Sequence, residues 1–153
     1  MIFVSTSPRK TAGLGRLLGS CLSGGSAVAL VGSLGSGKTT FVRGMASGLG
    51  VEKSEVKSPG FVFLHVYNGK SPVYHFDLYR LCSPRDLSGI GFDEFVWDAG
   101  AVSVVEWAER AADALPEDRL NIRFIDLGGT KRKIIVTPQG ERSRRILKWF
   151  SRK

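Results

Sequence analysis

The segment GSLGSGKTT, which runs from Gly32 to Thr40, contains the complete phosphate-loop pattern G-x-x-x-x-G-K-[ST]. A continuous apolar run of strand length, Ala27 to Val31, comes directly before it. After it, apolar residues recur at fourfold spacing along Thr39 to Leu49, as they do in a helix. Because strand, loop and helix follow in this order, the segment predicts a site for the phosphates of a nucleotide.

The residue types in the loop suit this task. Gly32, Gly35 and Gly37 allow the backbone to turn so that successive N–H groups point at phosphate oxygens. The Lys38 side chain adds a positive charge beside the β- and γ-phosphates, and the Thr39 hydroxyl is placed to bind Mg²⁺. The predicted cofactor-binding residues are Gly32, Ser33, Leu34, Gly35, Ser36, Gly37, Lys38, Thr39 and Thr40.

The remaining patterns predict one α/β domain. With 153 residues, 42% of them hydrophobic and 24% charged, the chain has the size and composition of one soluble domain. Predicted strands are 2–5, 27–31, 61–67, 73–78, 101–105, 120–127 and 133–137; predicted helices begin at 8, 39, 83 and 108. We therefore expect a single P-loop NTPase domain with a mostly parallel central sheet, an antiparallel margin and helices on both faces.

The end of the chain has a different composition. We assign residues 1–140 to the P-loop domain and residues 141–153, ERSRRILKWFSRK, to a basic amphipathic tail that holds +5 of the net charge of +8. Either the apolar face of this tail docks on its own domain and leaves the basic face in solvent, or the tail contacts RNA or a partner protein.

No segment has the length of a membrane span. The longest apolar runs have about five residues, whereas roughly 20 are needed to cross a bilayer. Arg9 and Lys10 follow a very short apolar stretch, which is not the order found in a signal peptide. We expect a cytoplasmic protein without membrane contact.

Two acids follow apolar strands and are candidates for work beside the loop. Asp77 ends the run Val73 to Phe76, and Glu106 follows Val102 to Val105. Ligands collect at the carboxyl ends of strands in α/β sheets, so both acids are placed to reach a metal or an attacking water. Alternatively, either acid pairs with Arg80 or a surface lysine, and Arg80 itself either contacts a phosphate or only forms such a pair.

Other classes of P-loop protein fit less well. The D-x-x-G matches at Asp86–Gly89 and Asp126–Gly129 would suit a GTPase, but patterns this short recur by chance, and the sequence has no guanine-specific N-K-x-D segment. ATP is therefore favoured as the nucleotide. A small-molecule kinase generally carries an arginine-rich lid, which is not evident here, but an autonomous kinase of a small metabolite stays as the alternative function.

Five motifs in sequence order resemble those of the bacterial TsaE (YjeE) family, the ATPase of tRNA threonylcarbamoyladenosine synthesis. They are GSLGSGKTTFVRGMASGLG, VKSPGF, VYHFDLYRL, GFDEF and VVEWAE, and their order and spacing agree over roughly residues 7–138. The phosphate loop occurs in many families, whereas its combination with HFDLYR and VEW is specific.

The resemblance implies a P-loop ATPase that is weakly active alone and binds ATP and Mg²⁺. Its partners would be the TsaD and TsaB proteins, which attach threonylcarbamoyl to the adenosine next to the anticodon of tRNAs. ATP hydrolysis would reset the TsaB-TsaD assembly between cycles, while the transfer chemistry lies in the partner. The implied catalytic residues are Glu106, Asp77 and Lys38, the implied metal-site residues are Thr39, Asp77 and Glu106, and Trp107 would help form the functional surface.

One position departs from the family pattern. The family usually has Ser-Pro-Thr-Phe where this chain has Ser58-Pro59-Gly60-Phe61, so a hydroxyl that could bind Mg²⁺ or sense the γ-phosphate is missing from a predicted switch segment. Either backbone groups or the Ser58 hydroxyl compensate, or hydrolysis is slower; a nucleotide-gated binding module without turnover also stays open. The predicted partner or switch residues are Ser58, Gly60, Arg80 and Trp107.

Three aromatic residues near these motifs carry further expectations. His75 is a candidate base, but we expect a structural hydrogen-bonding role, because strand alternation places it on the face opposite Phe76. Trp97 is expected to pack in the core. For Trp107 both core packing and a functional role stay open, the latter because it directly follows Glu106.

Overall fold

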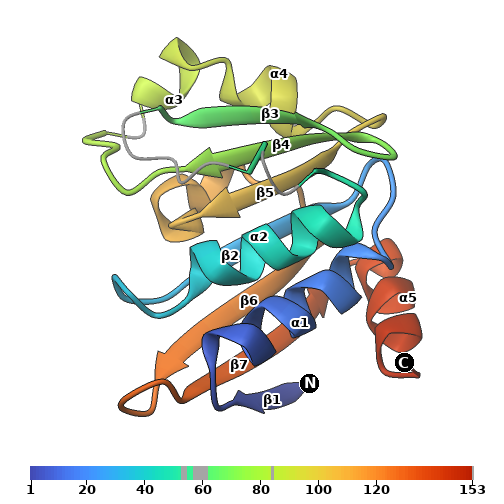
Figure 1. Cartoon of the computed structure of the whole chain (residues 1–153). Coiled ribbons are helices and arrows are strands. Elements are labelled where there is room, and N and C mark those ends of the chain that lie inside the picture. The colour runs from blue at the N-terminus through green and yellow to red at the C-terminus, as the bar shows by residue number, and fades with distance from the viewer. Residues whose placement is uncertain (53–54, 57–61, 84, 153) are drawn as a thin grey trace.

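A twisted sheet runs through the computed structural model, which describes residues 1–52, 55–56, 62–83 and 85–152 (Figure 1). Within these residues the sheet has seven strands in the order β1-β7-β6-β2-β5-β4-β3. Their bounds are β1 Ile2–Ser5, β2 Ala27–Val31, β3 Leu64–Asn68, β4 Pro72–Asp77, β5 Val102–Glu106, β6 Arg119–Asp126 and β7 Arg132–Gln139.

The centre of the sheet is parallel and its margins are antiparallel. Strand β2 pairs in parallel with β5 and β6, and β5 pairs in parallel with β4. The remaining pairs, β3 with β4, β6 with β7 and β1 with β7, are antiparallel. The α/β class, the mostly parallel centre and the antiparallel margin predicted from the sequence are therefore confirmed.

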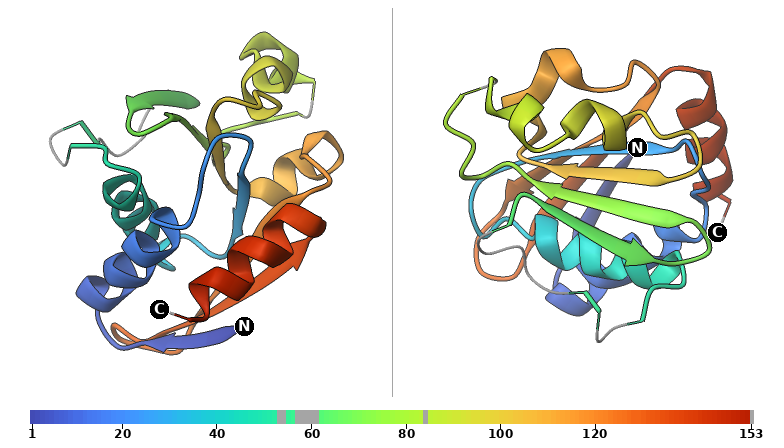
Figure 2. Two further views of the ribbon diagram at one scale, coloured as in Figure 1. Left: turned by 90° about the vertical axis from the view of Figure 1, so that its right-hand side faces the viewer. Right: turned by 90° about the horizontal axis from the view of Figure 1, so that it is seen from above.

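Helices cover both faces of the sheet, as predicted (Figure 2). One face carries α1 (Pro8–Gly19), α2 (Lys38–Gly48) and α5 (Glu141–Phe150), whose apolar residues belong to one buried cluster. The other face carries α3 (Asp86–Gly89), α4 (Phe92–Val96) and the 3-10 helix η1 (Ala108–Ala114), which share a second cluster. The two faces are thus packed separately, and the central strands are buried between them.

Helices α1 and α2 lie side by side in backbone contact, and glycines make this possible. A Cβ atom added at Gly15 would overlap the carbonyl oxygen of Phe41, and one added at Gly44 would overlap that of Ala12. Gly13, two residues before Gly15 on α1, has nothing within 4 Å of its Cβ position. The position of helix α2 on α1 is therefore fixed by backbone contact, and the first turn of α2 contains the end of the phosphate loop.

The C-terminal segment forms helix α5, whose apolar side packs on the domain. Phe150 is buried and its ring centroid lies 5.3 Å from that of Phe3 on β1. At the start of α5, the Asp118 carboxylate accepts hydrogen bonds from the backbone amides of Arg142 (2.7 Å) and Ser143 (2.9 Å). Burial alone would raise the pKa of Asp118, but these amides together hold it below its usual range. The basic side chains Arg144, Arg145, Lys148 and Arg152 are exposed.

Several elements differ from the prediction. The helix predicted to begin at residue 83 is the short helix α3, which begins at Asp86, and the helix predicted to begin at residue 108 is the 3-10 helix η1, with a non-helical residue at Ala111. Helix α4 was not predicted, because a helix this short has no periodicity to detect. The prediction that Trp97 packs in the core is wrong, since its side chain is 55% exposed. The first residue of the predicted strand 61–67 lies outside the described residues.

None of the helices in the described part of the chain is both long enough and apolar enough to cross a bilayer.

Replacing Gly15 and Gly13 with alanine is expected to change stability in opposite directions. Gly15→Ala forces a methyl group into the α2 backbone and should cost about 1–3 kcal/mol of unfolding free energy. Gly13→Ala meets open space in a helix and should add up to about 1 kcal/mol. Urea unfolding of both variants checks this. Equal effects of the two substitutions would contradict the backbone contact.

Candidate nucleotide-phosphate site

The phosphate loop connects β2 to α2 and has the backbone shape that its glycines permit. Gly32, Gly35 and Gly37 have φ angles of +151°, +73° and +102°, which side-chain-bearing residues rarely adopt. Gly37 is the N-cap of α2 and provides no side-chain cap. The N–H groups of the first turn of α2 therefore remain available to an anion at the positive end of the helix.

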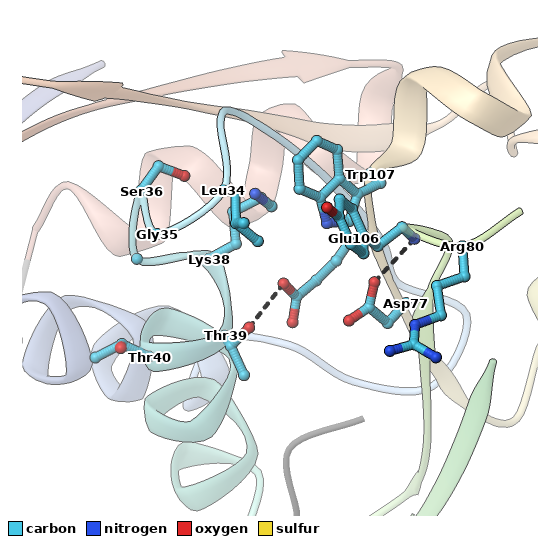
Figure 3. A pocket seen from close by; sticks show the side chains of 12 residues that line it. Leu34, Gly35, Ser36, Lys38, Thr39, Thr40, Asp77, Arg80, Glu106 and Trp107 are labelled. Atoms are coloured by element: carbon cyan, nitrogen blue, oxygen red, sulfur yellow. Dashed lines mark hydrogen bonds between the residues drawn. The ribbon is translucent and has the colours of Figure 1, made fainter. Parts of the chain in front are cut away.

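A cavity of about 350 Å³ opens beside this loop (Figure 3). Three segments line it: the loop with the start of α2, the residues that follow β4, and the residues at the end of β5. The lining residues are Leu34, Gly35, Ser36, Gly37, Lys38, Thr39, Thr40, Asp77, Tyr79, Arg80, Glu106 and Trp107. The predicted loop residues Gly32 and Ser33 do not line the cavity, but their carbonyl groups hold Lys38.

The two predicted acids meet because of strand register. Strands β4 and β5 are parallel neighbours, and Asp77 pairs with Glu106 at their carboxyl ends. Alternation along β5 places Glu106 on the same face as Val102 and Val104, which pack toward α1 and α2. Both carboxylates consequently lie beside the start of α2, next to Thr39 (Figure 3).

Glu106 is buried, with 1% of its surface exposed, and both of its oxygens have partners. Oε2 accepts a hydrogen bond from the Thr39 hydroxyl at 3.0 Å, and Oε1 lies 2.9 Å from Nε2 of His75. A hydroxyl has one hydrogen and two lone pairs. By donating its hydrogen to Glu106, Thr39 keeps its lone pairs free, so its hydroxyl oxygen could serve as one ligand of a bound cation.

Asp77 is more accessible than Glu106, and its Oδ1 accepts a hydrogen bond from the backbone amide of Tyr79 at 3.0 Å. Burial is the main cause that raises the pKa of Asp77, and the neighbouring Glu106 raises it further. The Tyr79 amide, His75 and Lys38 oppose this increase. A positive charge brought into the cavity would therefore favour the ionised form of Asp77.

Lys38 is held along the loop. Its Nζ donates hydrogen bonds to the carbonyl oxygens of Gly32 (2.7 Å) and Ser33 (3.0 Å) and lies 4.0 Å from the centroid of the Trp107 ring. Burial lowers the pKa of Lys38, and nearby carboxylates, first that of Glu106, oppose the decrease. The ammonium group is thus positioned at the loop by polar and cation–π contacts.

Trp107 has a strained backbone that directs its ring over the loop. It is the one described residue other than glycine with a positive φ, at 59°. This conformation costs a bulky residue on the order of 1–2 kcal/mol. The ring packs against that of Tyr79, with centroids 4.9 Å apart and planes tilted by 43°, and faces Lys38. Of the two roles left open for Trp107, its position fits a role at the site.

The other predicted site residues have different outcomes. Arg80 lines the cavity next to Asp77, whereas the side chain of Thr40 points away from the two acids (Figure 3). Ser58 and Gly60 lie outside the described residues. Within the described part, no group of three His, Cys, Asp or Glu side chains could hold a metal by itself. A metal here would need oxygens from the Thr39 hydroxyl, the nucleotide or water in addition to the two acids.

Two residues at the site were not predicted. Tyr79 lines the cavity and belongs to the HFDLYR motif, which was the available signal. Arg132, on β7, donates hydrogen bonds to the carbonyl oxygens of Ser36 (3.1 Å) and Gly35 (3.2 Å) and forms an ion pair with Asp126 at 3.0 Å. Nothing local in the sequence signals this contact, because it joins segments 96 positions apart.

Neither D-x-x-G match lies in the cavity lining. Asp86–Gly89 forms helix α3. Asp126 ends β6, and its Oδ1 accepts a hydrogen bond from the Gly128 amide in the turn that leads to β7. Both matches are therefore elements of local structure.

Comparisons with known proteins agree on one family. The family model described as "Threonylcarbamoyl adenosine biosynthesis protein TsaE" matches residues 5–134. The chain is 45% identical to the tRNA threonylcarbamoyladenosine biosynthesis protein TsaE of Treponema pallidum, over 87% of this chain and 97% of that protein. It is 36% identical to the protein of the same name from Bacillus subtilis, over 97% and 92%. The crystal structure of Bacillus subtilis YdiB superposes with a TM-score of 0.82 at 32% identity and covers 99% of this chain and 94% of that one.

Asp77→Asn is expected to stabilise the nucleotide-free, magnesium-free protein at neutral pH. Because the folded-state pKa of Asp77 is raised, wild-type stability falls as the pH rises from the unfolded pKa, about 3.9, through the folded value. The gain should be complete at pH 7 and vanish below about pH 3.9. Urea unfolding across pH tests this, with exposed Asp113→Asn as the control. A loss of stability at pH 7 specific to Asp77→Asn would contradict it.

Proposed function

This chain belongs to the TsaE family, and we propose that it is the ATP-hydrolysing component of the machinery that adds threonylcarbamoyl to the adenosine next to the anticodon of tRNAs. In this proposal it acts in the cytoplasm with the TsaB and TsaD proteins and resets their assembly between cycles, while the transfer reaction takes place in the partner. The names of the relatives support a role in this pathway. The proposed hydrolysis rests on the site.

The observation that carries the proposal is the meeting of Lys38, Thr39, Asp77 and Glu106 at one cavity beside the phosphate loop. The loop amides and Lys38 would bind the β- and γ-phosphates of ATP, and Thr39 with the acids would hold Mg²⁺. The bound ion would neutralise charge on the phosphates as the terminal group leaves.

The two acids have different environments, which suggests different roles. Glu106 is fully buried and tied to Thr39, so it would orient the Thr39 hydroxyl and the metal site. Asp77 is more accessible and lies next to Arg80, so it would be the acid that positions the attacking water. Lys38 and Arg80 would stabilise the negative charge that develops on the phosphoryl oxygens.

Phosphate release from Mg-ATP, with and without TsaB, TsaD and tRNA, is the test of this function. We expect slow release by the chain alone and strong stimulation by the partners. Phosphate transferred to a small acceptor would instead identify an autonomous kinase. ATP binding without release in any mixture would identify a nucleotide-gated module and overturn the proposal.

Two variants assign the site in the same assay. Lys38→Ala should lower ATP affinity and reduce release about 100-fold, because it removes the main charge on the phosphates. Glu106→Gln should fold and bind ATP but lose about 100-fold in release, because the neutral amide no longer holds the Thr39 hydroxyl and the magnesium site in place. Lys70→Ala is the matched control and should behave as wild type. Lys70 is an exposed lysine in the turn between β3 and β4, at the other end of β4 from Asp77. Normal release by Lys38→Ala would refute the assignment.

A further inference from the structure

A buried histidine lies directly behind the acid of the site. His75, on β4, has no exposed surface, and its Nε2 lies 2.9 Å from Oε1 of Glu106. Its other ring nitrogen, Nδ1, lies 3.3 Å from the hydroxyl oxygen of Tyr67 on β3. A continuous path of polar contacts thus leads from Tyr67 through His75 and Glu106 to Thr39 at the start of α2.

Strand geometry places these groups on one face. His75 and Asp77 are two residues apart on β4 and share the side of the sheet that faces α2. On β5, His75 pairs with Val104, two residues before Glu106. The imidazole is therefore a layer below the cavity, covered by the carboxylate of Glu106, and is not among the residues that line the cavity. Its hydrogen bond reaches the site through Glu106.

The hydrogen-bond partners assign the protons along this path. Burial, with a further contribution from Glu106, raises the pKa of Tyr67 to about 12, so its hydroxyl keeps its proton and can donate to Nδ1. A neutral imidazole that accepts at Nδ1 carries its hydrogen on Nε2, which then donates to Glu106. Glu106 accepts from His75 at one oxygen and from Thr39 at the other.

We propose that His75, oriented by Tyr67, is a positioning residue of the nucleotide site that fixes one oxygen of Glu106 so that the other stays on the Thr39 hydroxyl. This inference rests on the proposed function, since it concerns the geometry in which ATP would be hydrolysed. A buried carboxylate that loses one of two donors is left with an unsatisfied oxygen and turns toward other partners. The Thr39 hydroxyl then loses its fixed direction toward the metal.

The two substitutions that separate positioning from packing are His75→Leu and His75→Gln. Leucine fills the core but donates no hydrogen bond, whereas the glutamine amide can donate to Glu106 near the place of Nε2. With TsaB, TsaD and tRNA present, His75→Leu should lower kcat for phosphate release about 10- to 100-fold and change KM for ATP less than about threefold. His75→Gln should recover most of the lost rate.

A second readout does not depend on turnover. The Mg²⁺ concentration that half-saturates ATP binding by the full-length chain should rise about tenfold in His75→Leu and little in His75→Gln. In a Glu106→Gln background, His75→Leu should add almost nothing to this change, because residues that act through one another are not additive. If wild type releases no phosphate, the proposed function fails, but this binding measurement still tests His75.

Unfolding curves decide whether each variant is folded in the assay. A folded His75→Leu variant with wild-type kcat and wild-type magnesium dependence would overturn the proposal, as would equal losses in His75→Leu and His75→Gln. If His75→Leu does not fold, Tyr67→Phe provides the test, because it keeps the ring and removes the hydroxyl that donates to Nδ1. It should lower kcat by about threefold or more, and an unchanged kcat would refute the role of Tyr67 and His75.

Discussion

A hydrogen bond from the Thr39 hydroxyl to the buried Glu106 carboxylate joins two segments 67 positions apart, and the candidate site depends on it. Burying a carboxylate is costly unless each oxygen has a donor, so Glu106 requires both its strand and its neighbours in place. The parallel register of β4 and β5 brings Asp77 beside it, and the seat of α2 on α1 brings Thr39 to it. The site is therefore a product of the whole fold.

Much of this arrangement could be predicted because its signals are local. The phosphate loop is a contiguous pattern, and Ala27–Val31 and Val102–Val105 are apolar runs that end at functional residues. The hydrogen-bonding role predicted for His75 followed from strand alternation, and the structure places the ring on that face. That Glu106 would be its hydrogen-bond partner was not predicted, because the sequence of neither strand shows that β4 and β5 are neighbours in the sheet.

The features that were not predicted are elements too short to show a sequence pattern and contacts between segments that are far apart in the sequence. Helix α4 is too short for periodicity, and Arg132 reaches the loop across the sheet. Trp97 was expected to pack in the core, yet it is the C-cap of α4 and lies exposed. Residues 141–153 were predicted to form an amphipathic tail, and the contacts of α5 with Phe3 and Asp118 show where its apolar side docks. Trp149 on that helix is exposed beside the basic side chains.

The guanidinium of Arg132 has a mechanical consequence. It donates hydrogen bonds to the carbonyl oxygens of Gly35 and Ser36 in the phosphate loop, and also to Asp126 and the carbonyl oxygen of Gly129 in the β6–β7 hairpin. The phosphate loop and the hairpin tip are thus bound to a single side chain. A displacement of the hairpin tip would therefore pull on the phosphate loop or break these hydrogen bonds, so the two segments are mechanically coupled through Arg132.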